Sequence, residues 1–311
     1  MSNDRPRLLN LPLAAAAAEL MPPKSGTGYR SEGINARTVH ANGLEFAVLE
    51  AGSGPLALCL HGFPDCAHTW RHLLPELAAA GYHAVAPFMR GYAPTGVPTN
   101  GDYRMSTVAA DAVALHDVLN GTSEAVLIGH DWGAEAAYRA AAAEPERWRR
   151  LVTLAVPPAG LDAVLFADFE QLKRFWYIFM FRDPGEFAAD IVAADDLAFA
   201  DRLWRDWSPG FDAREHLALV KDSLRTPANL AAAIGYYRAA GDAIANAAIA
   251  PQPTLYLHGA ADGCIGAEFA ASAPEFLGAG SRVAVVDGAG HFLQLERPAE
   301  VNAQIVNWIT N

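Results

Sequence analysis

Short apolar segments alternate with longer amphipathic segments along most of the chain. Residues 56–60 and 126–128 are continuously apolar, which is typical of strands buried on both faces of a sheet. Residues 70–80 and 106–119 have the periodicity of helices, and each is followed by a glycine that fits a helix end. The sequence Asn42-Gly43, between two strand patterns, predicts a hairpin. This alternation predicts an α/β fold whose mostly parallel sheet is flanked by helices.

The alternation stops in the second half of the chain and resumes near its end. The interrupting stretch contains helical patterns, no strand pattern and most of the large aromatic side chains. Strand patterns return at 254–258 and 282–286, and a last helix is expected at 298–309. The sequence therefore predicts three parts: an N-terminal extension (1–30), a core domain (31–156 and 249–311) and an inserted all-helical cap or lid (157–248).

Composition narrows the class of protein. Apolar residues make up 52% of the 311 residues, which is enough for a sizeable core. The net charge of −12 argues against nucleic acid and anionic membranes as partners, because both require basic patches. No apolar run approaches the roughly 18 residues of a membrane span. The cysteines Cys59, Cys66 and Cys264 match no zinc pattern and no disulfide framework, so we expect no metal site.

The first residues only loosely resemble a secretory signal. Arg5 and Arg7 precede an apolar, alanine-rich stretch, but Asp4, Asn10 and Pro12 interrupt it. We expect a cytoplasmic protein, with export as the less favoured alternative. The formation of a homo-oligomer stays open.

The motif Gly129-His130-Asp131-Trp132-Gly133 lies between a strand pattern and an alanine-rich helix pattern. Its glycines allow a sharp turn with Asp131 at the apex, which is the geometry of the nucleophile elbow of α/β-hydrolases, where serine is usual. A carboxylate is ionised at neutral pH, so it attacks carbon without a base and forms a covalent ester. The alternative is a turn aspartate that only caps the helix.

Other polar groups follow other strand patterns, at the edge where open α/β sheets bind ligands. His291, in a glycine-rich loop after the last strand, is expected to activate the water that hydrolyses the ester. Asp262, after the preceding strand, is expected to orient this imidazole, and Asp287 is its rival. Structural roles in loops or turns are the alternatives for both. The backbone N–H groups of Phe63 and Trp132 are expected to form an oxyanion hole.

Two tyrosines of the helical insertion, Tyr177 and Tyr237, are further candidates. A phenol donates a hydrogen bond to an oxygen that becomes an alkoxide. Aromatic residues in a helical lid are more commonly packing, so residue type alone favours a core role for each tyrosine.

Together these motifs resemble the α/β-hydrolase-fold epoxide hydrolases, from about residue 35 onward. The matching stretches are His61-Gly62-Phe63-Pro64, Arg90-Gly91-Tyr92, Gly129-His130-Asp131-Trp132-Gly133, the Asp262 loop and Gly290-His291-Phe292. The elbow with its tryptophan is shared with haloalkane dehalogenases, so it identifies the branch and not the reaction. A cis bond is expected before Pro64, in a tight functional turn.

The insertion matches the family at the tyrosines. Residues 175–185 resemble the cap stretch with the first ring-opening tyrosine, and Tyr177 falls on that position. Residues 236–238 resemble the helix with the second, and Tyr237 fits because the family has Tyr followed by Arg, with Tyr236 as the nearest rival. Ile178 replaces the polar residue of many relatives, which is expected to change the polarity of the pocket.

The resemblance implies an enzyme that converts a small apolar epoxide and water to a vicinal diol, with no metal and no organic cofactor. Tyr177 and Tyr237 hold the epoxide oxygen, Asp131 forms the ester, and a water activated by His291 and Asp262 hydrolyses it. The substrate pocket is expected to include His61, Pro64, Trp176, Ile178 and Phe292.

Two other functions stay open. A haloalkane or haloacid dehalogenase uses the same nucleophile, with the Trp132 indole holding the halide, but Phe63 offers no second side-chain N–H. A non-catalytic binding protein on the same fold is disfavoured by the complete catalytic set. A serine esterase is disfavoured because Asp131 replaces the serine.

Overall fold

The structure is a computed structural model that describes residues 33–240 and 249–311. The predicted extension, residues 1–30, and the last residues of the predicted lid, 241–248, lie outside the described residues. Within the two described ranges, no helix combines the length and the apolar character needed to cross a membrane.

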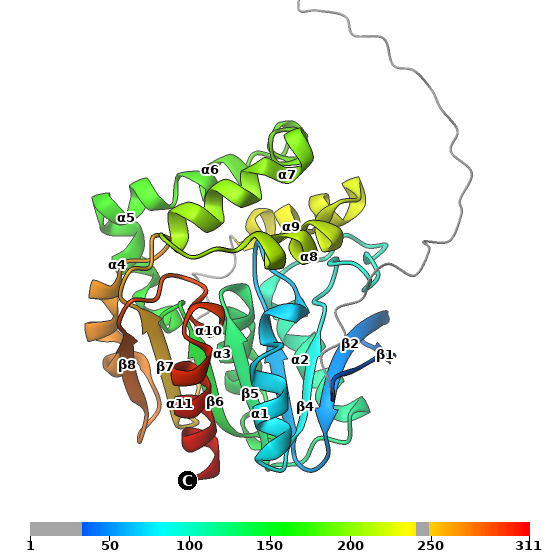
Figure 1. Ribbon diagram of the computed structural model, residues 1–311, viewed down its shortest axis with the longest axis vertical. Helices are drawn as coiled ribbons and strands as arrows, with labels where there is room; N and C mark the ends of the chain where they lie inside the picture. The colour runs from blue at the N-terminus through cyan, green and yellow to red at the C-terminus, as the bar shows by residue number, and fades with distance from the viewer. Residues whose placement is uncertain (1–32, 241–248) are drawn as a thin grey trace, which may run out of the picture. The chain divides into compact units, whose positions relative to one another are not determined.

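One sheet of eight strands lies at the centre of the described chain (Figure 1). The strands are β1 (Asn35–Ala41), β2 (Leu44–Gly52), β3 (Leu56–Leu60), β4 (His83–Pro87), β5 (Ala125–His130), β6 (Trp148–Leu154), β7 (Thr254–Gly259) and β8 (Arg282–Val286). Their order is β1-β2-β4-β3-β5-β6-β7-β8, and β2 pairs antiparallel with both of its neighbours, whereas the remaining pairs are parallel. The predicted mostly parallel sheet and the hairpin between β1 and β2 are confirmed.

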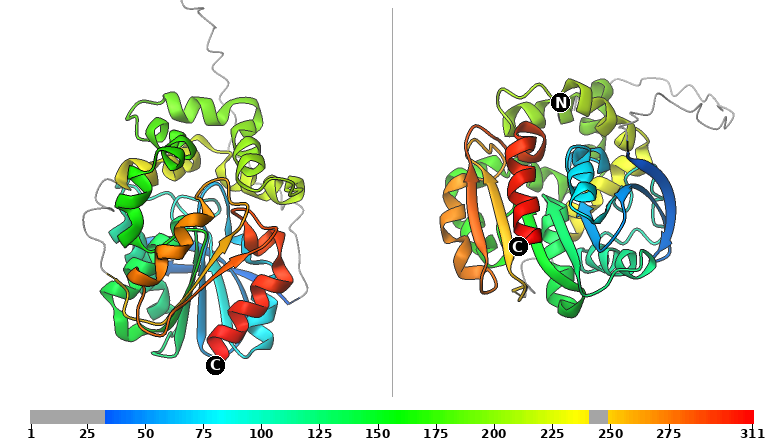
Figure 2. Two further views of the ribbon diagram at one scale, coloured as in Figure 1. Left: turned by 90° about the vertical axis from the view of Figure 1, so that its left-hand side faces the viewer. Right: turned by 60° about the horizontal axis from the view of Figure 1, so that its bottom comes forward.

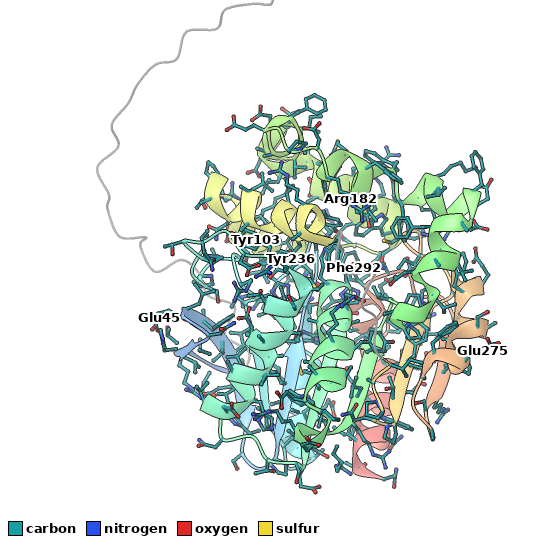
Figure 3. The ribbon with its side chains drawn as sticks, turned by 180° about the vertical axis from the view of Figure 1, so that it is seen from behind. Glu45, Tyr103, Arg182, Tyr236, Glu275 and Phe292 are labelled. Carbon is teal, nitrogen blue, oxygen red and sulfur yellow. The ribbon has the colours of Figure 1, made fainter. Side chains whose placement is uncertain are left out.

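Helices cover both faces of this sheet. The core helices are α1 (Leu73–Ala79), α2 (Met105–Val118), α3 (Trp132–Ala143), α10 (Leu293–Glu296) and α11 (Pro298–Thr310), with 3-10 helices η1 (Ala67–Trp70), η2 (Pro145–Arg147) and η6 (Ala267–Phe276). The helices α1 and α11 contact each other in front of the sheet in Figure 1, and α2 and α3 contact each other on the face seen in Figure 3. The strands β3 and β5 between these layers are buried along their whole length, as their apolar runs predicted.

The chain between β6 and β7 is helical in its described part, as predicted. Its helices are η3 (Ala159–Leu161), α4 (Asp162–Ala167), α5 (Phe169–Arg174), α6 (Trp176–Phe181), α7 (Phe187–Trp207), α8 (Arg214–Leu224) and α9 (Pro227–Ala239). We call the stretch from α4 to α9, residues 162–239, the helical segment. Figure 2 shows it, in green to yellow, above the sheet. The helix α9 contacts α6, α7 and α8, so the segment has its own internal packing.

Local signals explain where several helices begin and end. The Asp168 carboxylate accepts a hydrogen bond from the Gln171 N–H at 2.8 Å, which caps α5. Thr226 caps α9 in the same way, directly before Pro227. The predicted helix from residue 70 begins later, because residues 67–70 form the separate turn η1. The strand β6 ends at residue 154, because Ala155 has a left-handed backbone with φ 66°.

Candidate active site

Asp131 lies in the turn between β5 and α3. Its backbone has φ 52° and ψ −123°, a strained conformation for a residue with a side chain. A Cβ on Gly129 would lie 2.2 Å from the Gly133 carbonyl oxygen, and a Cβ on Gly133 would lie 2.2 Å from the Leu60 carbonyl oxygen. Both glycines are therefore required by close backbone approach. The turn presents Asp131 at the carboxyl edge of the sheet, as the elbow motif predicted.

The loop after β3 holds one oxygen of the Asp131 carboxylate. Its Oδ1 accepts a hydrogen bond from the Phe63 backbone N–H at 2.7 Å. A Cβ on Gly62 would lie 2.1 Å from the same oxygen, so the loop can approach Asp131 this closely only with glycine at position 62. The peptide bond before Pro64 is cis, as expected. Trp132 begins α3, and its backbone N–H is among the first four of a helix, which no helical carbonyl reaches.

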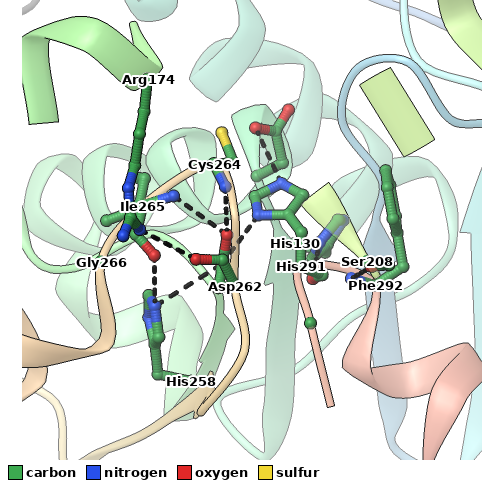
Figure 4. Close-up of polar contacts among 12 residues, drawn as sticks. His130, Arg174, Ser208, His258, Asp262, Cys264, Ile265, Gly266, His291 and Phe292 are labelled. Atoms are coloured by element: carbon green, nitrogen blue, oxygen red, sulfur yellow. Dashed lines mark hydrogen bonds and ion pairs between the residues drawn. The ribbon is translucent and has the colours of Figure 1, made fainter. Parts of the chain in front are cut away.

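His291 bridges two carboxylates from different loops. Its Nε2 lies 3.5 Å from Asp131 Oδ2, and its Nδ1 lies 2.9 Å from Asp262 Oδ2 (Figure 4). The other oxygen of Asp262 accepts the backbone N–H groups of Cys264 at 2.7 Å and Ile265 at 2.9 Å. Because both oxygens of Asp262 are engaged, the carboxylate can fix the orientation of the imidazole.

These carboxylates hold a proton on His291. Burial alone lowers the pKa of the imidazole, but Asp262 and Asp131 outweigh burial and raise the pKa of His291 to about 10. Burial favours the neutral form of Asp262 too, but the adjacent His291 outweighs it and lowers the pKa of Asp262. At neutral pH the site therefore contains an imidazolium between two carboxylates. Asp287, the rival of Asp262, is exposed.

The backbone of His291 is fixed from two sides. Its N–H donates to the Trp207 carbonyl at 3.0 Å, at the end of α7. Its carbonyl accepts a hydrogen bond from His130 Nε2 at 2.9 Å. Burial, with the neighbouring His291 adding to it, lowers the pKa of His130 to about 4, so this ring is neutral and carries its proton on Nε2. The position of His130 in the motif does not predict this role, because the carbonyl that it contacts lies 161 residues away.

Tyr177 from α6 and Tyr237 from α9 line one cavity with Asp131. Their side chains are 3% and 2% exposed, and their ring centres lie 5.7 Å apart. Tyr237 Oη has no hydrogen-bond partner among the described residues. Tyr177 Oη lies 3.4 Å from the Sγ of Cys264. The structure thus brings together both predicted tyrosines and the predicted nucleophile.

Tyr236, the rival of Tyr237, has a different environment. Its hydroxyl donates to the Arg90 carbonyl at 3.0 Å, and its ring stacks on Tyr103 (Figure 3). Arg238 joins α9 to the loop after α6, where its guanidinium donates to the backbone carbonyls of Phe181, Asp183 and Gly185. The Tyr-Arg pair therefore puts one residue in the cavity and uses the next to hold the helices of the two tyrosines together.

The five predicted pocket residues have different positions. Ile178 lines the cavity. The described lining residues do not include the other four. Trp176 is 50% exposed, and Phe292 stacks on the Trp204 ring with centroids 3.4 Å apart.

His61 and Pro64 flank Gly62 and Phe63 in the loop after β3. His61 is buried, and its Nε2 accepts the backbone N–H of Met89 at 3.0 Å. The Pro64 carbonyl accepts the Trp204 indole N–H at 2.7 Å. Both residues shape the loop that presents the Phe63 N–H. The motif alone does not distinguish this structural position from a position in the pocket wall.

Four polar residues of the cavity wall were not anticipated: Glu135, Asp162, Arg182 and Cys264. Glu135 lies four residues after Asp131, and this spacing puts it one turn further along α3. Burial, reinforced by Glu135, raises the pKa of Asp162 to about 7. Cys264 lies two residues after Asp262, and this closeness to a predicted catalytic residue is the one feature of the sequence that indicates a place in the cavity wall.

Among the described residues, one group has ligand atoms at metal-like spacing: Asp65, Cys66 and His216. His216 Nε2 already donates to Asp65 Oδ1 at 2.6 Å, and the Arg71 guanidinium donates to His216 Nδ1 at 2.9 Å. Burial raises the pKa of the Cys66 thiol, which disfavours a thiolate ligand. A buried hydrogen-bonded pair of carboxylate and neutral imidazole, with an adjacent guanidinium, accounts for this cluster.

Comparisons with known proteins agree with this architecture. A family model described as alpha/beta hydrolase fold matches residues 55–298. Epoxide hydrolase A from Mycobacterium tuberculosis is 30% identical over 319 residues, covering 88% of this chain and 97% of that protein. Epoxide hydrolase 2 from Siraitia grosvenorii is 32% identical over 327 residues, covering 89% and 99%. The crystal structure of Epoxide Hydrolase A from Mycobacterium thermoresistibile has a TM-score of 0.76 at 28% identity, covering 89% and 98%.

Proposed function

Because this chain belongs to the α/β-hydrolase-fold epoxide hydrolases, we propose that it converts an epoxide to a vicinal diol through a covalent ester on Asp131. One observation carries the proposal: the carboxylate of Asp131 and the buried phenols of Tyr177 and Tyr237 line the same cavity. Ring opening needs a nucleophile for carbon and a donor for the leaving oxygen. This cavity supplies both.

The first step is attack on a ring carbon. Oδ1 of Asp131 is engaged by the Phe63 N–H, so Oδ2 is the oxygen that attacks. As its bond to carbon forms, the ring C–O bond breaks, and the epoxide oxygen takes a proton from a phenol. Burial raises the pKa of Tyr177 and of Tyr237 well above the usual range, so both phenols are protonated donors at neutral pH.

Ester formation prepares His291 for the second step. The ester is neutral, so one of the two carboxylates that held the proton on His291 is lost and the pKa of the imidazole falls. The released proton restores the phenol. Neutral His291 then takes a proton from water, which attacks the Asp131 carboxyl carbon, and the backbone N–H groups of Phe63 and Trp132 stabilise the oxyanion. Collapse breaks the bond to the substrate oxygen, which is protonated from His291, and the diol leaves.

The helical segment acts as a cap in this proposal, with 157–248 as the cap and 31–156 and 249–311 as the core domain. Contacts between the segment and the catalytic loops support this role. The Arg174 guanidinium donates to the Asp262 carbonyl at 2.9 Å, and the Gln171 amide donates to the Cys264 carbonyl at 2.8 Å. With the Trp207 contact to His291, the cap helices hold both loops of the histidine–aspartate pair.

A single turnover in ¹⁸O-labelled water tests the covalent route. Enzyme in excess over styrene oxide is quenched after one turnover. Mass spectrometry then measures the ¹⁸O content of the diol and of the peptide that contains Asp131. We expect diol formation with the label in Asp131. Label in the diol alone would show direct attack of water on the epoxide.

Halide release is the second candidate, and one observation favours it. The Trp132 indole Nε1 is buried without a hydrogen-bond partner among the described residues, and Trp132 lines the cavity. Such an N–H suits a departing halide. Release of halide from a panel of haloalkanes, with no diol from epoxides, would favour this function over epoxide hydrolysis.

A further inference from the structure

The two cavity tyrosines differ in what their hydroxyl groups contact. Tyr237 Oη has no hydrogen-bond partner among the described residues, although its side chain is almost fully buried. Tyr177 Oη contacts Cys264 Sγ at 3.4 Å, and Cys264 lines the same cavity. Within residues 33–240 and 249–311, the two phenols therefore differ, because the Tyr177 hydroxyl has a side-chain contact at 3.4 Å and the Tyr237 hydroxyl has no hydrogen bond.

The backbone on both sides of the Cys264 side chain is fixed. Its N–H donates to Asp262 Oδ1 at 2.7 Å, and its carbonyl accepts from the Gln171 amide at 2.8 Å. Gln171 lies in α5, one helix before Tyr177 in the helical segment. The thiol thus belongs to the loop that orients His291 and contacts the phenol of Tyr177, and the Cys264 backbone is bonded both to Asp262 and to α5.

The direction of the contact decides what Tyr177 can do. A phenol has one proton, so a Tyr177 that donates to sulfur cannot donate to an epoxide oxygen at the same time. If the thiol donates instead, the phenol proton is available to the cavity. Burial raises the pKa of the Cys264 thiol well above its usual value, so the S–H donor is present at neutral pH.

We propose that Cys264 is a positioning residue for ring opening, whose S–H donates to Tyr177 Oη and directs the phenol O–H at the epoxide oxygen. The proposal rests on the proposed function. As Asp131 Oδ2 bonds to the ring carbon and the ring C–O bond breaks, the epoxide oxygen takes the Tyr177 proton. The thiol stabilises the resulting phenolate and keeps its own proton, so sulfur is neither oxidised nor alkylated.

Rates of the two half-reactions test this assignment. The variants Cys264→Ala and Cys264→Val remove the donor, and Cys264→Ser replaces it with a hydroxyl. We expect ester formation from styrene oxide to slow about 10-fold without the donor, as for loss of a hydrogen bond to a charged group. Ser should restore it to within about threefold of wild type. Ester hydrolysis should keep its wild-type rate in all three, measured by rapid quench and mass spectrometry.

The serine and valine variants distinguish this role from packing. Val fills the space of the thiol without a donor, whereas Ser keeps a donor in a smaller side chain. If Cys264 only packs, ester formation should be close to wild type in Cys264→Val and slow in Cys264→Ser. Donation to Tyr177 predicts the opposite order.

A double-mutant cycle with Tyr177→Phe completes the test. In that background, Cys264→Ala should not slow ester formation further, because its partner hydroxyl is gone. The matched control is Cys59→Ala, a buried cysteine in β3 that leaves both half-reactions unchanged. Wild-type rates of ester formation in both Cys264→Ala and Cys264→Val overturn the inference, and so does an equal loss in the Tyr177→Phe background. Wild-type enzyme that forms no diol overturns the proposed function itself.

Discussion

The half of the site built on strand ends holds its polar groups differently from the half built on inserted helices. On the sheet side, the Asp262 carboxylate accepts hydrogen bonds from two backbone N–H groups and from the imidazole of His291 (Figure 4). The backbone N–H and carbonyl of His291 are hydrogen-bonded as well. On the helical side, the Tyr237 hydroxyl has no partner among the described residues and the Tyr177 hydroxyl has one thiol. The first half is preorganised, whereas the second keeps donors available for a ligand.

The difference follows from the chemistry assigned to each half. A buried charged pair is stabilised when other hydrogen bonds engage its groups, and here the partners of Asp262 and of His291 Nδ1 are fixed. A phenol is neutral, and a buried neutral hydroxyl without a partner costs only about 1–3 kcal/mol. That cost is recovered when a substrate oxygen accepts the hydrogen bond. Two half-sites with different tolerance for unsatisfied groups therefore share one cavity.

The largest effect is expected from the nucleophile on the sheet side. Asp131→Asn should lower turnover by about four orders of magnitude or more, because an amide does not attack the ring. The shape of the cavity is retained, so binding of the diol product should be close to wild type. Steady-state diol formation and calorimetric titration with diol measure the two quantities. A variant with unchanged behaviour in both would support a non-catalytic binding role.

His291 should separate the two half-reactions. His291→Gln should lower steady-state turnover by about 10³-fold, because the general base is lost. Ester formation persists, so one equivalent of substrate per enzyme should react in a burst and remain attached to Asp131. Intact-protein mass after mixing with styrene oxide measures the adduct. Steady turnover at the wild-type rate without an adduct would remove His291 from the hydrolysis step.

On the helical side, neighbouring tyrosines provide a matched pair. Tyr237→Phe should slow ester formation about 10²-fold, as for loss of one donor to a developing oxyanion, with ester hydrolysis unchanged. Tyr236→Phe loses a hydrogen bond to the Arg90 carbonyl and should lower stability by about 1 kcal/mol while ester formation stays at the wild-type rate. Thermal unfolding and rapid quench read the two effects. The reverse pattern would assign the donor to Tyr236.

The sheet side could be predicted from sequence because its constraints are local or topological. Close backbone contacts require the glycines around Asp131, so the motif itself specifies the turn. Asp262 and His291 follow neighbouring parallel strands, β7 and β8, whose carboxyl ends meet at one edge. The exposure of Asp287 also agrees with the preference for Asp262, which rested on loop position.

The helical side could not be predicted in the same way. Aromatic residues that pack and those that line a cavity have the same helical spacing, so only the family resemblance selected Tyr177 and Tyr237. Trp176 shows the limit of this prediction, because it directly precedes Tyr177 and was expected in the pocket, yet it is half exposed. Cys264 depends on the contact of a loop with a helix 87 residues away, which neither motif nor periodicity encodes.

The smallest expected effect is a pH dependence of the free energy of unfolding, which arises on the sheet side of the site and not on the helical side. The pKa of His291 is about 10 in the folded chain against 6.5 for an ordinary histidine, so its contribution to stability is complete below about pH 6.5 and is lost as pH rises through 10.

Between pH 7 and 8, the free energy of unfolding should therefore fall by about 1 kcal/mol from this group, because the folded chain holds a proton that the unfolded chain has released. Urea unfolding at both pH values measures the difference. In His291→Gln the fall should largely disappear, whereas Tyr177→Phe should retain it, because burial keeps that phenol protonated throughout this range. A fall that persists in His291→Gln would mean that the sheet side does not store its proton on this imidazole, and the contrast between a charged, preorganised half and a neutral, available half would then lose its electrostatic basis.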